Sequence, residues 1–323
     1  MRLIFRQIAL AVFALTFATG ALAQAFPMKP VRIVVPYAPG GGIDLVARPV
    51  AQRLSVQLGQ PVVVENRPGA SGIVGAEVVA KSAGDGYTLL VTGASHYLQP
   101  FVTRNIPYDT RNDFVPVAPI ARAPILIVVN SAAPIRSIDE LVEQSKQRVG
   151  GLPYVTAGPN SSQHLAALLL AGMTGAKLEH VAYKGGSPAL SDLVSGEVPM
   201  GVLVMGTVWP QVKTGKLRPI AFVERAGSRN APDVPVVGDR VKGYAMPDLW
   251  VGALASRGTP AAIAQRLNDE IQQAAATPEV RERLEAIGYE VMPAQSVAMF
   301  TTTVNEALSV YQRITSDAGI KPE

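Results

Sequence analysis

Short runs of aliphatic and β-branched residues alternate with longer amphipathic segments from residue 31 onward. This alternation is typical of strands that are joined by helices. The expected elements of the first hundred residues are strands at 31–37, 61–65 and 87–92 and helices at 44–58 and 71–82. Such a βαβαβ order predicts parallel strands with helices on both faces of an open sheet. Pro49 lies inside the first expected helix and should kink it or break it at Arg48.

A second α/β unit follows the turn at 106–109. Ser137 and Glu140 form a capping-box pattern that should open a short helix. The other expected elements are strands at 125–129, 154–157, 179–182, 200–204 and 217–222 and helices at 163–173 and 188–194. A further strand is expected within 244–254, and then the pattern becomes helical, with helices that open at Pro260 and Pro278 and a last helix over 296–315. The fold class is therefore α/β.

The composition indicates a folded chain with room for two domains. It has 323 residues, of which 48% are hydrophobic and 17% charged. The formal net charge is +4, and without Arg2 and Arg6 in the first 25 residues it is 27 minus 25, or +2. No run of basic residues offers a footprint for nucleic acid, so a nucleic-acid partner is not expected. The absence of cysteine excludes disulfides, thiolate metal sites and a lipid-anchored N-terminal cysteine.

The first 25 residues have the features of a secretory signal peptide. Arg2 and Arg6 precede an apolar run over 8–18, and small residues at 21, 23 and 25 suit cleavage after Ala23 or Ala25. An apolar core of this length is too short to cross a bilayer, which takes about 20 residues. We therefore expect residues 1–25 to be removed and the mature protein to reside in the periplasm.

A glycine-rich loop lies between the first strand and the first helix, at residues 37–44 (YAPGGGID). Consecutive glycines let main-chain amides approach a ligand closely, and the N-terminus of the following helix adds a partial positive charge. An anion is the expected occupant; the alternative is a tight turn in which Asp44 caps the helix. The loop matches neither the G-x-G-x-x-G dinucleotide fingerprint nor a P-loop, which disfavours nucleotide binding.

Three further loops occupy the corresponding position after other strands. They are residues 92–96 (TGASH), 156–162 (TAGPNSS) and 183–188 (YKGGSP). Ligands of open parallel sheets bind beyond the carboxyl ends of the strands. Two sheets that faced each other across these loops would therefore form one anion-binding cleft.

The sequence resembles the Bug family of periplasmic solute-binding proteins, the receptors of tripartite tricarboxylate transporters. The matching segments, in order along the chain, are 29–44 (KPVRIVVPYAPGGGID), 64–70 (VENRPGA), 84–89 (GDGYTL), 106–109 (IPYD), 183–186 (YKGG) and 318–323 (AGIKPE). The resemblance implies a two-lobed, type II-like periplasmic-binding-protein fold, in which each lobe is a mostly parallel sheet flanked by helices. Lobe 1 would comprise residues 26–123 and 250–323, and lobe 2 residues 124–249.

By the same resemblance, main-chain amides and bound waters in the loops hold a small carboxylate between the lobes. The implied ligand-binding residues are Tyr37, Ala38, Gly40, Gly41, Asp44, Ser95, His96, Gly158, Asn160, Ser161, Tyr183, Gly185 and Gly186. The implied partners are the carboxylate and the permease subunits of the transporter, with a monomeric receptor and no cofactor. Residues 92–98, 196–199 and 234–239 depart from the family pattern, which leaves open whether the ligand is a dicarboxylate, tricarboxylate, amino acid or aromatic acid.

Other chemistry is less favoured by the sequence. His96, His164 and His180 are the only histidines and lack metal-ligand spacing, so no metal site is expected. Ser162 and His164 could suggest a periplasmic hydrolase, but residues two apart at a helix start point in different directions, and no G-x-S-x-G motif is present. A ligand-sensing adaptor for a membrane sensor kinase remains an alternative, because such an adaptor would need the same ligand-bound surface.

Overall fold

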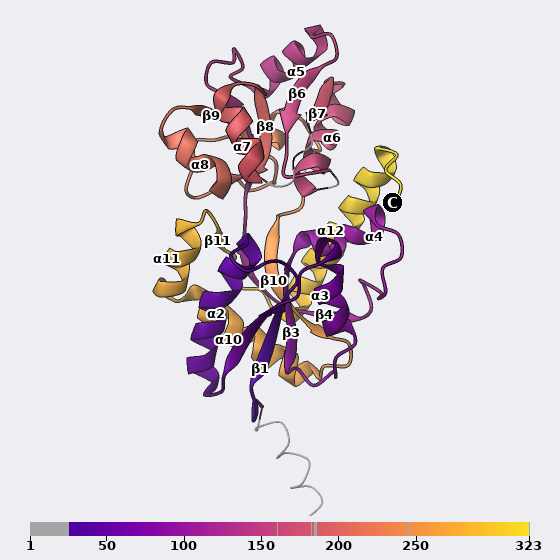
Figure 1. The fold of residues 1–323 in the computed structure, drawn as a ribbon, viewed down its shortest axis with the longest axis vertical. Coiled ribbons are helices and arrows are strands. Elements are labelled where there is room, and N and C mark those ends of the chain that lie inside the picture. Colours follow the sequence, from indigo (N-terminus) through magenta and orange to yellow (C-terminus); the bar gives the residue numbers. More distant parts are fainter. Residues whose placement is uncertain (1–25, 160, 182, 184–185, 245, 323) are drawn as a thin grey trace, which may run out of the picture.

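The computed structural model describes residues 26–159, 161–181, 183, 186–244 and 246–322 and arranges them in two α/β bodies, each built on its own sheet (Figure 1). The expected signal peptide lies outside the described residues. Among the helices that are described, none has both the length and the apolar character that crossing a membrane requires.

The first body is built on a six-stranded sheet with strand order β11-β4-β10-β3-β1-β2. Its strands are β1 (Val31–Val35), β2 (Val62–Asn66), β3 (Thr88–Gly93), β4 (Phe114–Arg122), β10 (Trp250–Ser256) and β11 (Glu290–Val291). Strand β1 pairs in parallel with β2 and β3, as the βαβαβ pattern predicts. The helices are α2 (Gly42–Leu58), η1 (Ala70–Gly72), α3 (Ile73–Ala80), η2 (Ala94–Tyr97), α4 (Gln99–Val102), α10 (Ala261–Ala276), α11 (Pro278–Ala286) and α12 (Val297–Asp317).

The second body is built on a five-stranded sheet with strand order β7-β6-β8-β5-β9. Its strands are β5 (Ile125–Asn130), β6 (Leu152–Val155), β7 (Leu178–Val181), β8 (Met200–Val204) and β9 (Leu217–Phe222). Its helices are α5 (Ile138–Gln147), α6 (Ser162–Thr174), α7 (Gly186–Ser195), α8 (Met205–Lys213) and α9 (Val237–Arg240). The Ser137 hydroxyl accepts a hydrogen bond from the Glu140 amide, which confirms the predicted cap of α5.

Most strands of each sheet are parallel to one another, as predicted, and a minority run antiparallel to them. The strands joined by crossover helices are parallel, but β10 runs antiparallel to β3 and β4, and β5 runs antiparallel to β8 and β9. The reason lies in the path of the chain: β4 leads out of the first sheet directly into β5, and β10 re-enters the first sheet from the second body. Strands β5 and β10 therefore enter their sheets from the opposite end to most of the others.

Three prolines account for differences between the expected and observed elements. Helix α2 runs unbroken through Pro49, because the apolar face around it is buried in the core while Leu45, whose carbonyl loses its partner, lies on the exposed face. Strand β4 was not predicted from the sequence because it contains Pro116 and Pro119. Its pairing with β10 shifts register beside both prolines, which is where a sheet tolerates them.

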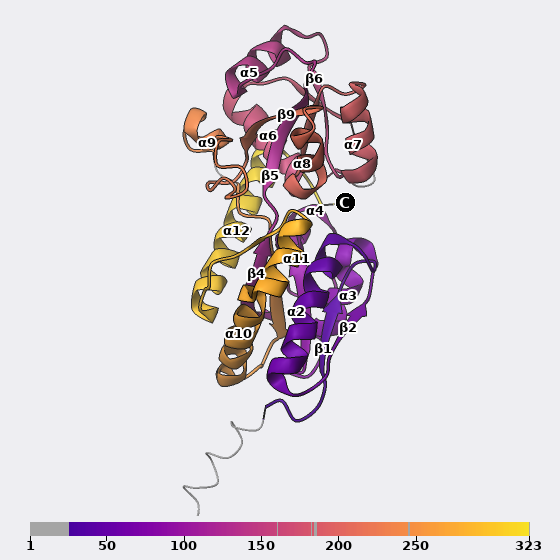
Figure 2. The ribbon, with the colours of Figure 1, turned by 90° about the vertical axis from the view of Figure 1, so that its left-hand side faces the viewer.

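The long helix α12 contacts both bodies (Figure 2). Its first half packs Phe300 and Val304 into the core beside Trp250. Its second half contributes Tyr311 and Ile314 to the core that contains strand β5 and helix α6. The C-terminal helix thus connects the two bodies along one side, in addition to the two places where the main chain crosses between them.

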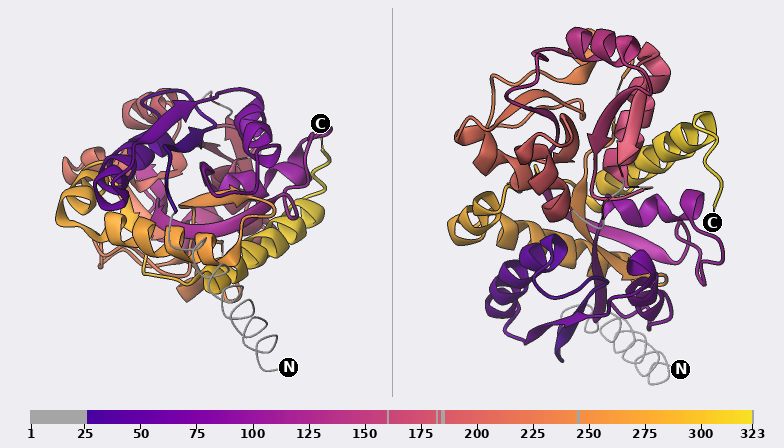
Figure 3. Two further views of the ribbon diagram at one scale, coloured as in Figure 1. Left: turned by 90° about the horizontal axis from the view of Figure 1, so that it is seen from below. Right: turned by 45° about the horizontal axis from the view of Figure 1, so that its top comes forward.

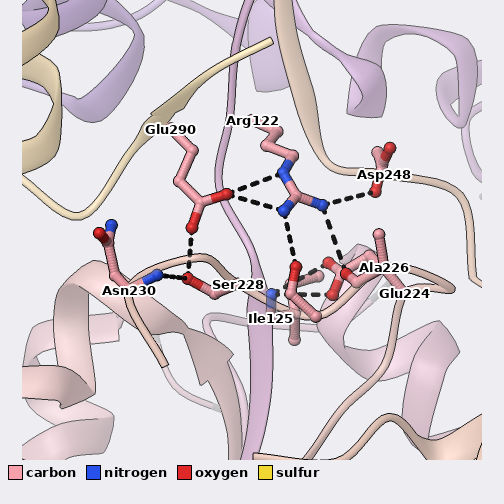
Figure 4. A network of polar contacts seen from close by, with 9 residues as sticks. Arg122, Ile125, Glu224, Ala226, Ser228, Asn230, Asp248 and Glu290 are labelled. Atoms are coloured by element: carbon pink, nitrogen blue, oxygen red, sulfur yellow. Dashed lines mark hydrogen bonds and ion pairs between the residues drawn. The ribbon is translucent and has the colours of Figure 1, made fainter. Parts of the chain in front are cut away.

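A buried polar network surrounds the first crossing (Figure 4). The Arg122 guanidinium, at the end of β4, donates to Glu290 Oε2 from Nε at 3.1 Å and from Nη2 at 2.7 Å. It also donates to the carbonyls of Ala226 at 3.3 Å and Gly227 at 2.6 Å, on the segment that returns from the second sheet. Asp248 on the same segment lies 3.6 Å from Nη1. Arg122 therefore ties the returning segment to the first body.

Glu224 supports the same crossing from the second body. Its carboxyl group is buried and accepts the Ile125 amide at 2.9 and 3.2 Å, at the first residue of β5. Burial raises the pKa of Glu224 well above its usual value. The main chain at the crossing is thus fixed by side chains on both sides.

Candidate functional site

The loops predicted to bind an anion lie where the two bodies face each other. Helices α2, α6 and α7 all begin at this junction, as Figures 1 and 3 show. Tyr37, Ala38, Gly40 and Gly41 lie in the loop before α2. Ser95 and His96 lie in η2, after the end of β3. Asn160 and Gly185 fall outside the described residues, so the structure gives no position for these two predicted residues.

Each outer glycine of the triplet at the start of α2 has a specific reason to be glycine. Gly40 has φ +78°, a left-handed conformation that side chains with a Cβ rarely adopt. At Gly42, an added Cβ would lie 2.4 Å from the Tyr289 hydroxyl. Gly41 occupies the N-cap position, and no side chain caps the helix there. The first turn of α2 therefore has main-chain N–H groups that no side chain caps.

The Asp44 side chain stabilises this loop through hydrogen bonds. Its side chain is buried, and its Oδ2 accepts the Gly40 amide at 2.8 Å and the Arg48 Nε at 2.7 Å. Its Oδ1 accepts Asn66 Nδ2 at 2.8 Å, and the same amide donates to the Tyr37 carbonyl at 3.0 Å. Burial alone would raise the pKa of Asp44, but hydrogen bonds from Arg48, Gly40 and Asn66 together lower it. The Asp44 carboxylate thus supports the loop while Gly41 occupies the N-cap position, and a contact between Asp44 and a ligand stays a prediction.

Replacing Asp44 with asparagine should therefore loosen the loop. An amide cannot accept from all three donors, so we expect the free energy of unfolding at pH 7 to fall by about 1–3 kcal/mol. Because the folded-state pKa is lowered, the stabilisation by the ionised group is present above the unfolded pKa of about 3.9 and is lost as the pH falls through the folded value. Urea denaturation from pH 7 to pH 3 should show that the difference in the free energy of unfolding between wild type and variant becomes smaller in acid.

The matched control is Asp85→Asn, which removes an exposed carboxylate paired with Lys29. The supporting role of Asp44 would be contradicted if the loss of unfolding free energy in Asp44→Asn stayed constant down to pH 3. It would also be contradicted if that loss were no larger than the loss in the control.

Two other turns of the first body meet the glycine loop. The Tyr37 hydroxyl lies 3.4 Å from Ser95 Oγ, and a Cβ at Gly72 would lie 3.2 Å from the same hydroxyl. Residues 69–72 before α3 all have positive φ, including Ala70 at 45° and Ser71 at 54°. Such strain in residues other than glycine is typical of functional sites. Sequence reasoning missed this turn as part of the site, although Pro68 and Gly69 gave a turn signal.

The loops of the second body also meet each other. A Cβ at Gly158 would lie 3.2 Å from the Tyr183 carbonyl, and Gly158 has φ +147°. Ser161 is the N-cap of α6, where its hydroxyl accepts the His164 amide at 3.2 Å and donates to the Gly158 carbonyl at 2.7 Å. The Tyr183 hydroxyl donates to Asp192, and this bond raises the pKa of Tyr183 to about 12.

Gly186, the last of the predicted residues, begins α7 and faces α8. A Cβ there would lie 3.4 Å from Thr207 Cγ2 and 3.5 Å from Thr207 Oγ1. Thr207 was not predicted, because nothing in the sequence signals that the starts of α7 and α8 are neighbours.

Two of the three histidines, His164 and His180, stack with their ring centroids 4.1 Å apart. His96 is buried against the rings of Tyr97, Tyr108 and Phe114, and burial lowers its pKa to about 3. It is therefore neutral, and its Nε2 is buried without a hydrogen-bond partner among the described residues, so that its contact with a ligand stays a prediction. Within the described ranges, no three histidine, aspartate or glutamate side chains gather as a metal site would require. Ser162 is buried, with its hydroxyl 3.5 Å from that of Tyr311.

The two bodies also touch through main chain close to the glycine loop. A Cβ at Gly206, in α8, would lie 2.4 Å from the Ile287 carbonyl. A Cβ at Gly288, which follows α11, would lie 2.2 Å from Gly206 Cα. Only hydrogen atoms fit between these backbones, so this pair of glycines sets how closely the two bodies approach.

Comparison with known proteins identifies the family. The model of the tripartite tricarboxylate transporter family receptor matches residues 46–319. BugT of Bordetella pertussis (strain Tohama I) is 35% identical over 286 residues, which cover 86% of this chain and 88% of BugT. The structure of R. palustris Rpa4515 with adipate has a TM-score of 0.78 at 32% identity and covers 92% of this chain and 100% of its own.

A second structure, MatC (Rpa3494) from Rhodopseudomonas palustris with bound malate, has a TM-score of 0.72 at 30% identity and covers 90% of this chain and 100% of its own. These likenesses extend over both bodies and confirm the periplasmic-binding-protein fold that the sequence predicted. The chain belongs to the tripartite tricarboxylate transporter receptor family, a family of solute-binding proteins that includes the Bug proteins.

Proposed function

We propose that this protein binds a small carboxylate between its two bodies in the periplasm and delivers it to the permease subunits of a tripartite tricarboxylate-type transporter. A dicarboxylate is the preferred class, because the related structures named above hold adipate and malate. The observation that carries the proposal is the uncapped glycine turn of α2, braced by Asp44 and turned toward the second body.

The chemistry of the loops suits a carboxylate. Their donors are main-chain N–H groups and hydroxyls, and the Arg48 guanidinium beside the glycine loop is already bonded to Asp44 and Asn66. Burying an anion is costly unless several donors replace its water shell. Donors from one body alone would leave part of the carboxylate unpaired, so a ligand that contacts both bodies favours their approach.

A thermal-shift panel tests the proposal. It would compare adipate, malate, citrate, aspartate and benzoate with glucose and putrescine, using the chain without residues 1–25. A true ligand at 100 times its dissociation constant should stabilise the folded state by about 2.7 kcal/mol. Ligand recovered unchanged, as judged by NMR, supports a receptor rather than a hydrolase. Failure of all the carboxylates together with stabilisation by glucose or putrescine would contradict the proposal.

A further inference from the structure

Tyr289 lies against the glycine loop although it is far from it in sequence. It follows α11 and directly precedes β11. Its hydroxyl would be 2.4 Å from a Cβ at Gly42, and its Cζ would be 3.4 Å away. Gly42 is the first residue of α2, in the uncapped turn where the main-chain amides are free of side-chain acceptors. The Tyr289 hydroxyl therefore lies beside the main-chain amides of the first turn of α2.

This hydroxyl has no partner of its own among the residues that the structure describes. The hydroxyl forms no hydrogen bond with these residues. Its oxygen is not fully buried either, so solvent reaches it. The ring itself packs on the core of the first body. Burial raises the pKa of Tyr289 to about 12, so the phenol stays protonated at neutral pH. A protonated hydroxyl held on a packed ring is a preorganised hydrogen-bond donor.

We propose that the Tyr289 hydroxyl donates a hydrogen bond to the ligand carboxylate at the N-terminus of α2. The inference rests on the proposed function and adds a side-chain donor to the main-chain amides. It also explains the third glycine of the triplet: a Cβ at Gly42 would occupy the space of the hydroxyl. The preceding residue, Gly288, touches Gly206 of the second body, so one short segment carries both a ligand donor and a contact between the bodies.

The first test is calorimetry with Tyr289→Phe and the dicarboxylate that stabilises the wild type most. Loss of one hydrogen bond to a charged acceptor should raise the dissociation constant about 10-fold, while the unfolding temperature of the ligand-free protein stays the same. Tyr87→Phe is the matched control, because the Tyr87 hydroxyl bonds the Met28 amide away from the loops. The control should leave the dissociation constant unchanged.

The second test is a double-mutant cycle with Gly42→Ala. In the wild type, the new methyl group must displace the hydroxyl and should weaken binding by a similar factor. In the Tyr289→Phe background, the nearest ring atom, Cζ, lies 3.4 Å from the new methyl carbon, which is an ordinary contact. Gly42→Ala should therefore weaken ligand binding much less in that background.

The outcomes separate this inference from the proposed function. Unchanged affinity in Tyr289→Phe, or equal effects of Gly42→Ala in both backgrounds, would overturn the role of Tyr289 while the carboxylate receptor stands. A wild-type protein that binds no carboxylate would overturn the proposed function, and this inference with it.

Discussion

Replacing Arg122 with methionine is expected to lower the free energy of unfolding by about 3–5 kcal/mol. The Arg122 side chain is 13% exposed and that of its partner Glu290 is 8% exposed. Methionine would leave a buried carboxylate without its cation and two carbonyls, those of Ala226 and Gly227, without their donor. The removal of one partner from a buried pair is costly because the other charge stays desolvated. Urea denaturation at pH 7 measures the difference.

Arg283→Met provides the control for this prediction. Arg283 pairs with Glu279 on the surface, with 54% and 62% of the two side chains exposed, so its loss should cost less than about 1 kcal/mol. If the two variants lost similar amounts of stability, the network around the first crossing would not be the brace that we describe.

Replacing Gly206 with alanine is expected to weaken dicarboxylate binding by about 10- to 100-fold without unfolding the protein. Alanine is favoured over glycine inside a helix by about 1 kcal/mol, so α8 itself should tolerate the change. The new methyl carbon would nevertheless lie 2.4 Å from the Ile287 carbonyl and would hold the bodies apart. Overpacking of this kind costs about 1–3 kcal/mol. The proposed ligand takes donors from both bodies and so needs them close together. The cost of overpacking should therefore appear as a less favourable free energy of binding.

Gly172→Ala is the matched control for this second variant. Gly172 lies in α6, and an added Cβ there meets nothing within 4 Å. Calorimetry should give the wild-type dissociation constant for Gly172→Ala and a much higher one for Gly206→Ala. Equal affinities for the two variants would show that the contact between Gly206 and Gly288 does not control the spacing of the bodies.

Local patterns in the sequence predicted much of the fold. Parallel pairing of β1 with β2 and β3 follows from the βαβαβ order, and the cap of α5 follows from Ser137 and Glu140. The glycine turn before α2 was visible because consecutive glycines between a strand and a helix allow the main chain to approach a ligand closely. These features depend on residues that are close together in the chain.

Contacts between distant residues were not predictable from one sequence. Nothing near Gly42 points to Tyr289, and nothing near Arg122 points to Glu290. The mixed pairing of both sheets arises from the two chain crossings, which leave no periodic signal. The burial of His96 depends on Tyr108 and Phe114, which reach it from a later segment. The packing of His96 among these rings was therefore not visible in the sequence.

The most direct test of the account compares a dicarboxylate with its uncharged diamide by calorimetry on the wild-type protein. Adipate and adipamide have the same length and nearly the same shape, so they differ mainly in the negative charge that the loop amides are proposed to bind. We predict that adipamide, or the diamide of whichever dicarboxylate binds best, binds at least about 100-fold more weakly, which corresponds to about 2.7 kcal/mol. Equal affinity for the acid and the diamide would contradict the central claim that main-chain donors select an anion between the two bodies.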